Sequence, residues 1–198
     1  MTVELLFVTG NAGKVNEVKH HLQGTNYIIK QLTIEDLPEI QGTPEEVALH
    51  KLNSAAAILG DQDAILLTED TSLCFEALNG LPGAYIKDFL TNLGVENLHR
   101  LVTGFNTNKA YAQTIFGVKR PGQPAQLCAG RTLGRIVPAR GNHEFCGKGA
   151  SWDQAFEFDE EHELKGTTYG EMTLDQKNTV SHRSRAVSKV ISYLKSLE

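Results

Sequence analysis

The chain has 198 residues, of which 40% are hydrophobic and 22% charged, the composition of an ordinary soluble globular protein. We expect residues 1–198 to form a single domain, because this length suits one. The formal net charge of −5 provides no global basic field, which argues against a protein whose main task is to bind nucleic acid.

The cysteine content and the start of the chain bear on its compartment. The three cysteines, Cys74, Cys128 and Cys146, are odd in number and lack the paired spacing of a metal site. They indicate a reducing compartment without a disulfide framework. The chain opens in a strand-like segment, and no apolar run is long enough for a membrane span, so we expect no signal peptide, no membrane partner and a cytoplasmic location.

The first two predicted elements enclose an unusual turn. Residues 3–9 predict a buried strand and residues 13–23 a helix. The turn between them fails the Walker A pattern, which needs glycine and then Ser or Thr where the chain has Val8 and Val15. Its glycines also lack the dinucleotide-binding spacing.

The same turn still has the physical features of an anion site. A tight strand-to-helix turn presents free backbone N–H groups and the positive end of a helix dipole. Thr9, Asn11 and Lys14 add side-chain donors. This stretch alone is equally compatible with an anion site and with a plain turn that needs glycine.

The next elements alternate strand and helix. Residues 27–32 predict a second strand and residues 64–68 a third, apolar one. Between them, Thr43 is placed as a helix N-cap, with Pro44 at the first helical position and Glu46 three residues after the cap, for a helix that ends near Leu59. Alternating strands and helices with short connections predict an α/β core around a central sheet.

The second half of the chain predicts further elements of both kinds. Residues 110–119 and 126–137 predict a hairpin, whose second strand should be bent or bulged at Gly130 and Gly134. The remaining elements are predicted helices at residues 85–90 and 96–102, a short strand at residues 152–158, and a final helix at residues 181–197 that begins with Ser181 as N-cap.

A pair of carboxylates follows the third strand. Glu69 and Asp70 are adjacent where we expect the strand to end, so they should repel each other and favour a nearby cation. The plain alternative is an acidic helix start. Because the Lys14 turn ends another strand of the same predicted sheet, the combination suits Mg²⁺ and a polyphosphate.

Four other charged positions are ambiguous on spacing alone. Glu39 matters only if its loop folds over Asp70, and Lys51, on the apolar face of its helix, is most simply a snorkelling lysine. Lys87 is equally well an ordinary helix-face lysine. Arg183, with His182, falls in the first turn of the final helix, where positive charge opposes the helix dipole, which favours contact with an anion or a base edge over a solvated basic turn.

Several stretches in this order resemble the inosine triphosphate pyrophosphatase family, also called the Ham1-like or non-standard purine NTP pyrophosphatases. The resemblance runs nearly end to end and rests on FVTGNAGK, LPEIQGTPEE, LTEDTSLCFEALNGLPGAYIK, GRTLGRIV, SWDQAF, TYGEM and KNTVSHR. EDTSLCFEALNGLPGAYIK is similar to the eukaryotic branch. The resemblance implies an α/β fold of the Maf/Ham1-like kind, with an elongated central mixed sheet, flanking helices, two lobes around a substrate cleft, and a homodimer.

The resemblance also implies roles for particular residues. Asp70 would be the general base, with Glu69 beside it and Lys14 as a third catalytic residue, and Glu39 and Asp70 would bind Mg²⁺, with Mn²⁺ as an alternative. The implied substrate-binding residues are those of the phosphate loop, Thr9, Gly10, Asn11, Ala12, Gly13 and Lys14, the lysines Lys51 and Lys87, and Phe145, Trp152, Asp153, Lys177, His182 and Arg183 around the base and sugar-phosphate.

One stretch departs from the family pattern. The family usually has Phe-Gly directly before its aromatic-Asp pair, which here is Trp152-Asp153, and Pro after it, where this chain has Gln154. The nearest preceding ring is Phe145, separated from the pair by residues 146–151. Either Phe145 stacks on the base from a longer loop or no ring does so, and Trp152 is equally well a core residue.

The implied reaction is hydrolysis of ITP, dITP or XTP to the nucleoside monophosphate and pyrophosphate, which removes non-standard purine nucleotides from the precursor pool. The partner would be this small-molecule substrate, with no nucleic acid and no membrane. Two alternatives stay open: a Maf-like pyrophosphatase for pyrimidine or modified nucleotides, against which KNTVSHR argues, and a catalytically silent nucleotide-binding protein, against which Lys14, Glu39 and Asp70 argue.

Overall fold

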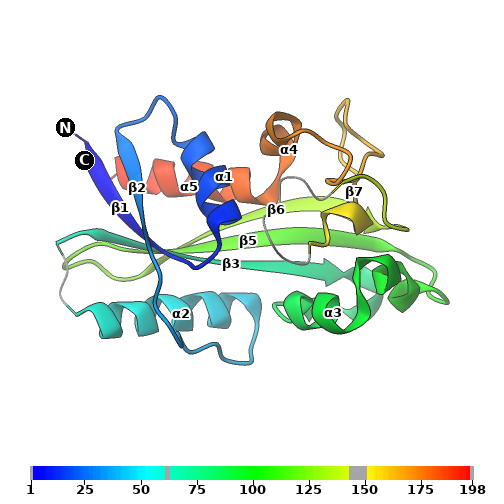
Figure 1. Ribbon diagram of the computed structural model, residues 1–198, viewed down its shortest axis with the longest axis horizontal. Coiled ribbons are helices and arrows are strands. Elements are labelled where there is room, and N and C mark those ends of the chain that lie inside the picture. The colour runs from blue at the N-terminus through cyan, green and yellow to red at the C-terminus, as the bar shows by residue number, and fades with distance from the viewer. Residues whose placement is uncertain (1, 61–62, 143–150, 197–198) are drawn as a thin grey trace. The chain divides into compact units, whose positions relative to one another are not determined.

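The computed structural model describes residues 2–60, 63–142 and 151–196, which form a mixed α/β fold around a seven-stranded sheet (Figure 1). The strand order is β2-β1-β3-β5-β6-β7, and β4 pairs with β3. The strands are β1 (Val3–Val8), β2 (Tyr27–Leu32), β3 (Ile65–Phe75), β4 (Pro82–Gly83), β5 (Lys109–Lys119), β6 (Gln126–Ile136) and β7 (Phe156–Phe158).

The helices flank the sheet, and the chain divides into two compact units. The helices are α1 (Ala12–His21), α2 (Pro44–Leu59), α3 (Ile86–Leu93), α4 (Leu174–Val180) and α5 (His182–Lys195), with 3₁₀ turns η1 (Glu76–Leu78), η2 (Val95–Val102) and η3 (Asp153–Ala155). Unit 1 comprises Met1–Asp70, Thr114–Gly130 and Arg183–Glu198, and unit 2 comprises Thr71–Gln113 and Arg131–His182.

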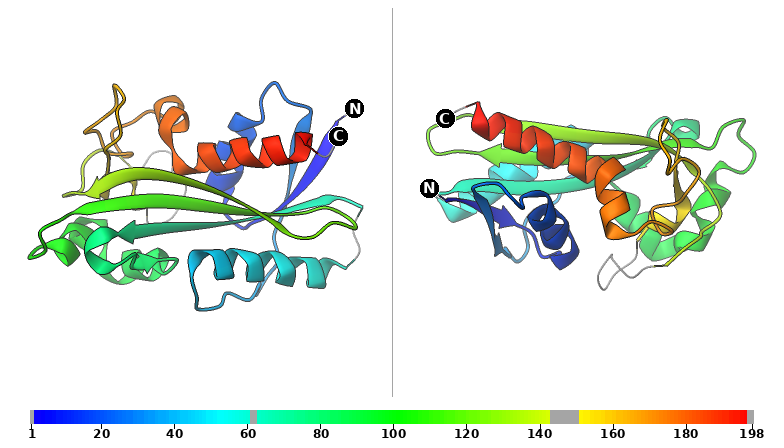
Figure 2. Two further views of the ribbon diagram at one scale, coloured as in Figure 1. Left: turned by 180° about the vertical axis from the view of Figure 1, so that it is seen from behind. Right: turned by 90° about the horizontal axis from the view of Figure 1, so that it is seen from above.

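In unit 1, strand β1 is buried on both faces. It pairs in parallel with β2 and β3, and α1 and α5 cover one face while α2 covers the other (Figures 1 and 2). Because side chains alternate along a strand, Leu5 and Phe7 pack with α1 and α5, whereas Leu6 and Val8 pack with α2. This double burial explains why the strand is a continuous apolar run in the sequence.

A local capping signal predicted the start of α2 correctly. Thr43 caps α2 in a capping box: its hydroxyl accepts from the Glu46 N–H at 3.3 Å, and the Glu46 carboxylate accepts from the Thr43 N–H at 2.8 Å. Pro44 occupies the first helical position, as expected. Helix α1 begins at Ala12 and ends at His21, somewhat before the predicted bounds, with Asn11 as N-cap.

Strand β3 corrects one expectation. The sequence predicted that the strand ends at residue 68, before Glu69 and Asp70, but β3 continues through both acids to Phe75. The two carboxylates therefore lie in the middle of a long strand rather than at its end. The strand tolerates them because each has a cationic partner from another element, as described below.

The predicted hairpin of β5 and β6 is present, and its second strand is continuous through Gly130 and Gly134. Gly134 allows a close approach of the chain, because a Cβ there would lie 2.4 Å from the Glu157 carbonyl oxygen. The short strand predicted at residues 152–158 shrinks to β7, which follows the turn η3 and pairs antiparallel with β6.

The end of the chain contains a helix that the sequence analysis missed. Helix α4 is a single short segment, and Ser181 is its C-cap: the Ser181 N–H donates to the Lys177 carbonyl at 2.8 Å. Ser181 was predicted as the N-cap of the final helix, and it does directly precede His182, the first residue of α5. The segment predicted as a helix at residues 96–102 is the 3₁₀ helix η2.

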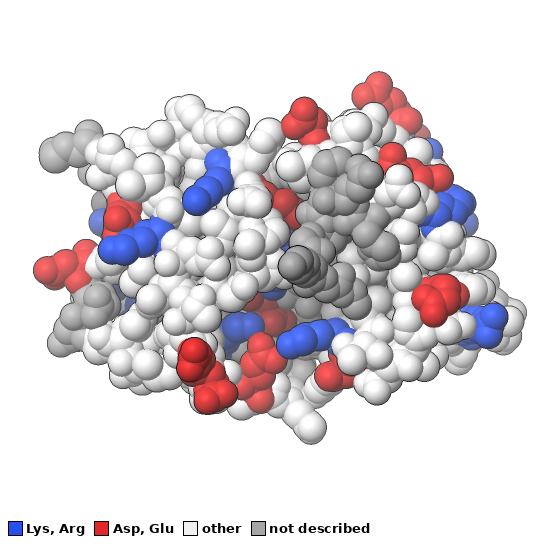
Figure 3. All heavy atoms as spheres, in the orientation of Figure 1, with Lys and Arg blue, Asp and Glu red and all other residues white. Residues whose placement is uncertain are grey.

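Basic and acidic side chains are interspersed on the face of the protein drawn in Figure 3, in line with the small net negative charge. Among the described residues, no helix combines the length and the apolar character that crossing a bilayer requires.

Candidate functional site

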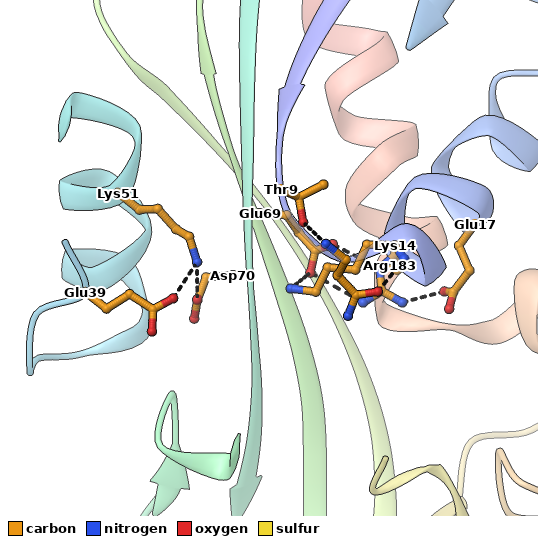
Figure 4. Close-up of polar contacts among 9 residues, drawn as sticks. Thr9, Lys14, Glu17, Glu39, Lys51, Glu69, Asp70 and Arg183 are labelled. Carbon is orange, nitrogen blue, oxygen red and sulfur yellow. Dashed lines mark hydrogen bonds and ion pairs between the residues drawn. The ribbon is translucent and has the colours of Figure 1, made fainter. Parts of the chain in front are cut away.

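The turn after β1 is organised by its own side chains. The Thr9 hydroxyl accepts from the Asn11 N–H at 3.1 Å, and the Asn11 side chain accepts from the Lys14 N–H at 3.2 Å (Figure 4). These bonds fix the start of α1 and bring the side chain of Lys14 toward β3. The turn is therefore a capped helix start whose lysine side chain extends toward β3.

Lys14 forms an ion pair with Glu69. The Lys14 Nζ lies 3.1 Å from a carboxylate oxygen of Glu69, whose side chain is fully buried. The Arg183 Nε donates to the other Glu69 oxygen at 3.1 Å. A buried carboxylate needs such charge-assisted partners, and Glu69 has two cations, one from α1 and one from α5.

Arg183 binds a second carboxylate, that of Glu17 in α1. Burial by itself would lower the pKa of Arg183, but Glu17 and Glu69 outweigh it and hold that pKa above its ordinary value. The positive charge in the first turn of α5 thus faces two protein carboxylates. Sequence reasoning missed Glu17, although its place between Val15 and Val18 on a buried helix face was a usable signal.

Asp70 lies on the opposite face of β3, toward α2 (Figure 4). The Lys51 Nζ lies 3.5 Å from an Asp70 oxygen and 3.1 Å from a Glu39 oxygen. The prediction of a merely snorkelling Lys51 is therefore wrong, because this lysine joins two carboxylates. The condition set for Glu39 is met, since Lys51 links the Glu39 loop to Asp70.

Electrostatics distinguish Asp70 from Lys51. Burial raises the pKa of Asp70, and the nearby Lys51 and Lys14 offset that effect only in part. Burial would lower the pKa of Lys51, but Asp70 and Glu39 outweigh it, so that pKa is raised. Lys51 therefore stays a cation, and Asp70 holds a proton more readily than an ordinary aspartate, as suits a group that accepts one in a reaction.

Glu39 and Asp70 have the donor chemistry of a Mg²⁺ site. Asp70 Oδ2 is buried and has no hydrogen-bond partner among the described residues. Within the described ranges, no group of three or more His, Cys, Asp or Glu side chains is arranged to hold a metal. Mg²⁺ commonly binds through one or two carboxylates together with substrate phosphates, so these two acids fit a metal that a phosphate helps to hold.

Unit 2 holds a separate cluster of the predicted base-site residues. The Lys177 Nζ lies 2.7 Å from an Asp153 oxygen, and both side chains are more than nine-tenths buried. His182 stacks on Tyr169 with ring centroids 5.8 Å apart, and its ring lies 5.3 Å from that of Trp152. Tyr169, which the sequence analysis did not single out, joins the aromatic part of this cluster.

Trp152 is a core residue, the alternative that the sequence left open. It is 7% exposed and packs edge-on against Phe156, with ring centroids 5.6 Å apart. Gln154, which stands where the family usually has Pro, donates its side-chain N–H to the Gly141 carbonyl at 2.6 Å. Lys87 is exposed in the first turn of α3. Phe145 lies outside the described residues.

The strand order and the lysine–carboxylate cluster on β3 define the class: a mixed α/β protein whose charged site is built on an inner strand of its sheet. The chain belongs to the Ham1 family, whose family model matches residues 5–193.

Curated relatives extend over nearly the whole chain. The "Inosine triphosphate pyrophosphatase" of Puccinia graminis f. sp. tritici is 43% identical over 194 residues, which cover 95% of each chain. The protein of the same name from Fusarium vanettenii is 42% identical over 190 residues, covering 96% of this chain and 95% of its own. These fungal relatives agree with the resemblance to the eukaryotic branch.

Solved structures support the fold. The Ham1 protein of Staphylococcus aureus has a TM-score of 0.78 at 22% identity and covers 98% of this chain and 100% of its own. A HAM1 protein from Coxiella burnetii has a TM-score of 0.77 at 20% identity with the same coverage. At these identities the likeness concerns the fold alone.

Proposed function

We propose that this chain is a nucleoside triphosphate pyrophosphatase that hydrolyses ITP, dITP and XTP to the nucleoside monophosphate and pyrophosphate. It would thereby remove non-standard purine nucleotides from the precursor pool, with residues 1–198 acting as one catalytic domain. The observation that carries the proposal is the pairing of Lys51 with both Glu39 and Asp70, in a chain 43% identical to a curated inosine triphosphate pyrophosphatase.

Glu39 and Asp70 are the residues that would hold the metal, Mg²⁺ or alternatively Mn²⁺. When bound, the ion supplies positive charge that screens the phosphates. Asp70 Oδ2 supports this assignment, because it has no hydrogen-bond partner among the described residues and a carboxylate oxygen has a lone pair for an ion besides one for a hydrogen bond. Lys51 lies within ion-pair distance of both acids, and its positive charge offsets part of the effect of burial on the pKa of Asp70.

In the proposed reaction, Asp70 accepts a proton from a water molecule as the water oxygen bonds to the α-phosphorus. The bond from the α-phosphorus to the α–β bridging oxygen breaks, and its electron pair leaves with pyrophosphate. The raised pKa of Asp70 supports the role of base. Lys14 would stabilise the departing charge, and Glu69 supports it by holding the ammonium group in place.

The remaining residues would bind the substrate. The turn of Thr9, Gly10, Asn11, Ala12, Gly13 and Lys14, together with Lys51 and Lys87, would hold phosphates. The residues proposed for the base and sugar-phosphate are Phe145, Trp152, Asp153, Lys177, His182 and Arg183. Specificity would come from the 6-oxo edge of the purine, because the 6-amino group of adenine leaves buried donors and acceptors mismatched.

We further propose that the protein acts as a homodimer in the cytoplasm, with a nucleotide as its only required partner. Its mixed surface charge supports the absence of a nucleic-acid role. Light scattering coupled to gel filtration tests the dimer directly. A monomer mass for fully active protein would remove that part of the proposal.

The decisive experiment is a nucleotide panel with product identification. With Mg²⁺, ITP and XTP should yield the monophosphate and pyrophosphate, and ATP should be hydrolysed far more slowly. Release of IDP and orthophosphate would contradict the proposed bond, and a preference for UTP or CTP would favour a Maf-like specificity. Binding of ITP without turnover in Mg²⁺ would identify a silent nucleotide-binding protein.

A further inference from the structure

Thr68 has a buried hydroxyl that the roles described so far do not use. The residue is 1% exposed, and its Oγ1 has no hydrogen-bond partner among the described residues. Leaving a buried hydroxyl unpaired is unfavourable, and valine would fill nearly the same space without that cost. The polar atom therefore indicates a partner that the described residues do not supply.

The packing around Thr68 makes room for this hydroxyl. Thr68 pairs with Val8 of β1 in the parallel ladder and lies against Gly117 of the neighbouring strand β5. A Cβ at position 117 would lie 2.8 Å from Thr68 Oγ1 and 2.9 Å from the Cβ of Leu52 in α2. The absence of a side chain at Gly117 thus leaves space for Thr68 beneath α2.

Thr68 and Asp70 share one face of β3. Residues two apart on a strand point to the same side, and here that side faces α2, where Lys51 meets Asp70 (Figure 4). Asp70 Oδ2 is the second buried polar atom of this face without a partner among the described residues. Two buried oxygens in need of hydrogen bonds therefore occur two residues apart on one face of one strand.

We propose that Thr68 is a positioning residue for Asp70, and that its hydroxyl and Asp70 Oδ2 together bind one buried water molecule. Alternate residues of a strand have Cα atoms about 6.6 Å apart, and one water can bridge oxygens separated by up to about 5.6 Å. The water donates to Asp70 Oδ2 and bonds to the Thr68 hydroxyl, while Lys51 holds the other carboxylate oxygen. Asp70 is then fixed through both oxygens.

The role of this water is to orient the carboxylate, and it is distinct from the water consumed in hydrolysis. The inference rests on the proposed function, in which Asp70 takes a proton from the attacking water. A carboxylate held through both oxygens spends more time in the productive orientation, which favours turnover. The hydroxyl of Thr68, rather than its methyl group, carries the effect.

Two substitutions separate the hydroxyl from the methyl group. Thr68→Val removes the hydroxyl at nearly constant volume and should lower kcat for ITP about fivefold, the value of one ordinary hydrogen bond, with KM unchanged. Thr68→Ser keeps the hydroxyl and should retain kcat within about twofold, although its Tm falls because a buried methyl is lost. Unchanged kcat in Thr68→Val, or an equal loss in both variants, would overturn the proposal.

Thr132→Val is the matched control for losing a buried hydroxyl. The Thr132 hydroxyl already has a protein partner, since it donates to the Val180 carbonyl at 2.8 Å. This variant should lose thermal stability while kcat stays near that of the parent protein. A fall in kcat equal to that of Thr68→Val would show that the kinetic loss is a general effect of removing a buried hydroxyl, and would overturn the proposal.

A crystal structure of the nucleotide-free protein, at a resolution that shows ordered water, tests the inference without any turnover. A water within hydrogen-bond distance of both Thr68 Oγ1 and Asp70 Oδ2 is the expected result. No such water, or a Thr68 hydroxyl bonded to a backbone carbonyl, would overturn it. Finding the water in a protein that does not cleave ITP would leave the water site established and place the failure in the proposed function.

Discussion

Glu69 and Asp70 are consecutive residues of β3, yet their carboxylates lie on opposite faces of the strand and have different partners. Glu69 is fully buried between Lys14 and Arg183, whereas Asp70 retains 15% side-chain exposure beside Lys51. Adjacency in sequence therefore does not make them a pair. Their substitutions should separate into a mainly structural effect and a mainly catalytic one.

Asp70→Asn should lose most of kcat for ITP while the fold is retained. Asparagine cannot accept the proton of the attacking water and is a poorer metal ligand, so a loss of about 10²-fold or more is expected. The Tm should not fall, because the substitution removes a charge whose burial is unfavourable. Steady-state kinetics and thermal melting measure the two effects, and near-normal kcat in the folded variant would remove Asp70 from the mechanism.

Glu69→Gln should lower the free energy of unfolding by about 2–3 kcal/mol, because it removes the buried counter-charge of Lys14 and one of the two carboxylates that pair with Arg183. Urea unfolding measures the change. The control is Glu161→Gln, which breaks an exposed pair with Lys165 at i, i+4 and should change the free energy of unfolding far less than Glu69→Gln does. Equal losses in both variants would show that burial adds nothing to the Glu69 pairs.

The parts of the fold encoded locally were predictable from the sequence. The cap at Thr43, with Pro44 and Glu46, involves only neighbours in the chain, and the structure reproduces it. The continuous apolar run of β1 likewise indicates that this strand is buried on both faces. The donors of the Lys14 turn also lie within a few residues of one another, and the role of this turn as an anion site stays a prediction.

Features that depend on distant partners were not predictable in this way. The sequence around Glu69 and Asp70 suggests that a strand ends there, because nothing nearby shows that Arg183 and Lys51 will neutralise the two acids. The apolar neighbours of Glu17 could have indicated its burial, but its partner Arg183 lies 166 residues later in the chain. Helix α4 is too short to establish a clear apolar periodicity.

The raised pKa of Asp70 predicts the sign of a stability effect. Burial raises this pKa above its ordinary value of 3.8, so in the window just above 3.8 the folded state binds more protons than the unfolded state. The free energy of unfolding should therefore fall, relative to that of Asp70→Asn, as the pH rises through the folded pKa. Urea unfolding of both proteins in EDTA, from about pH 4 to about pH 7, measures this difference.

Glu46 provides a control of opposite sign. Its hydrogen bonds from the Thr43 backbone and hydroxyl lower its pKa below the ordinary value of 4.5. The stability that Glu46 contributes is present above pH 4.5 and is lost as the pH falls through the folded pKa. The free energy of unfolding of the parent protein should therefore rise, relative to that of Glu46→Gln, as the pH rises from the folded pKa to 4.5. The same trend in both comparisons would contradict the assignment for Asp70.

Phe145 and Trp152 should respond in opposite ways to truncation. A base–aromatic stack contributes about 1–3 kcal/mol, so if Phe145 stacks on the purine, Phe145→Ala should raise KM for ITP sharply and leave the Tm nearly unchanged. Trp152 packs in the core against Phe156 and Tyr169, so Trp152→Ala should lower the free energy of unfolding by about 3–5 kcal/mol. An early-melting Phe145→Ala protein with unaltered KM would make Phe145 a packing residue. The base would then be held by hydrogen bonds from the backbone near Asp153 and from His182 and Arg183.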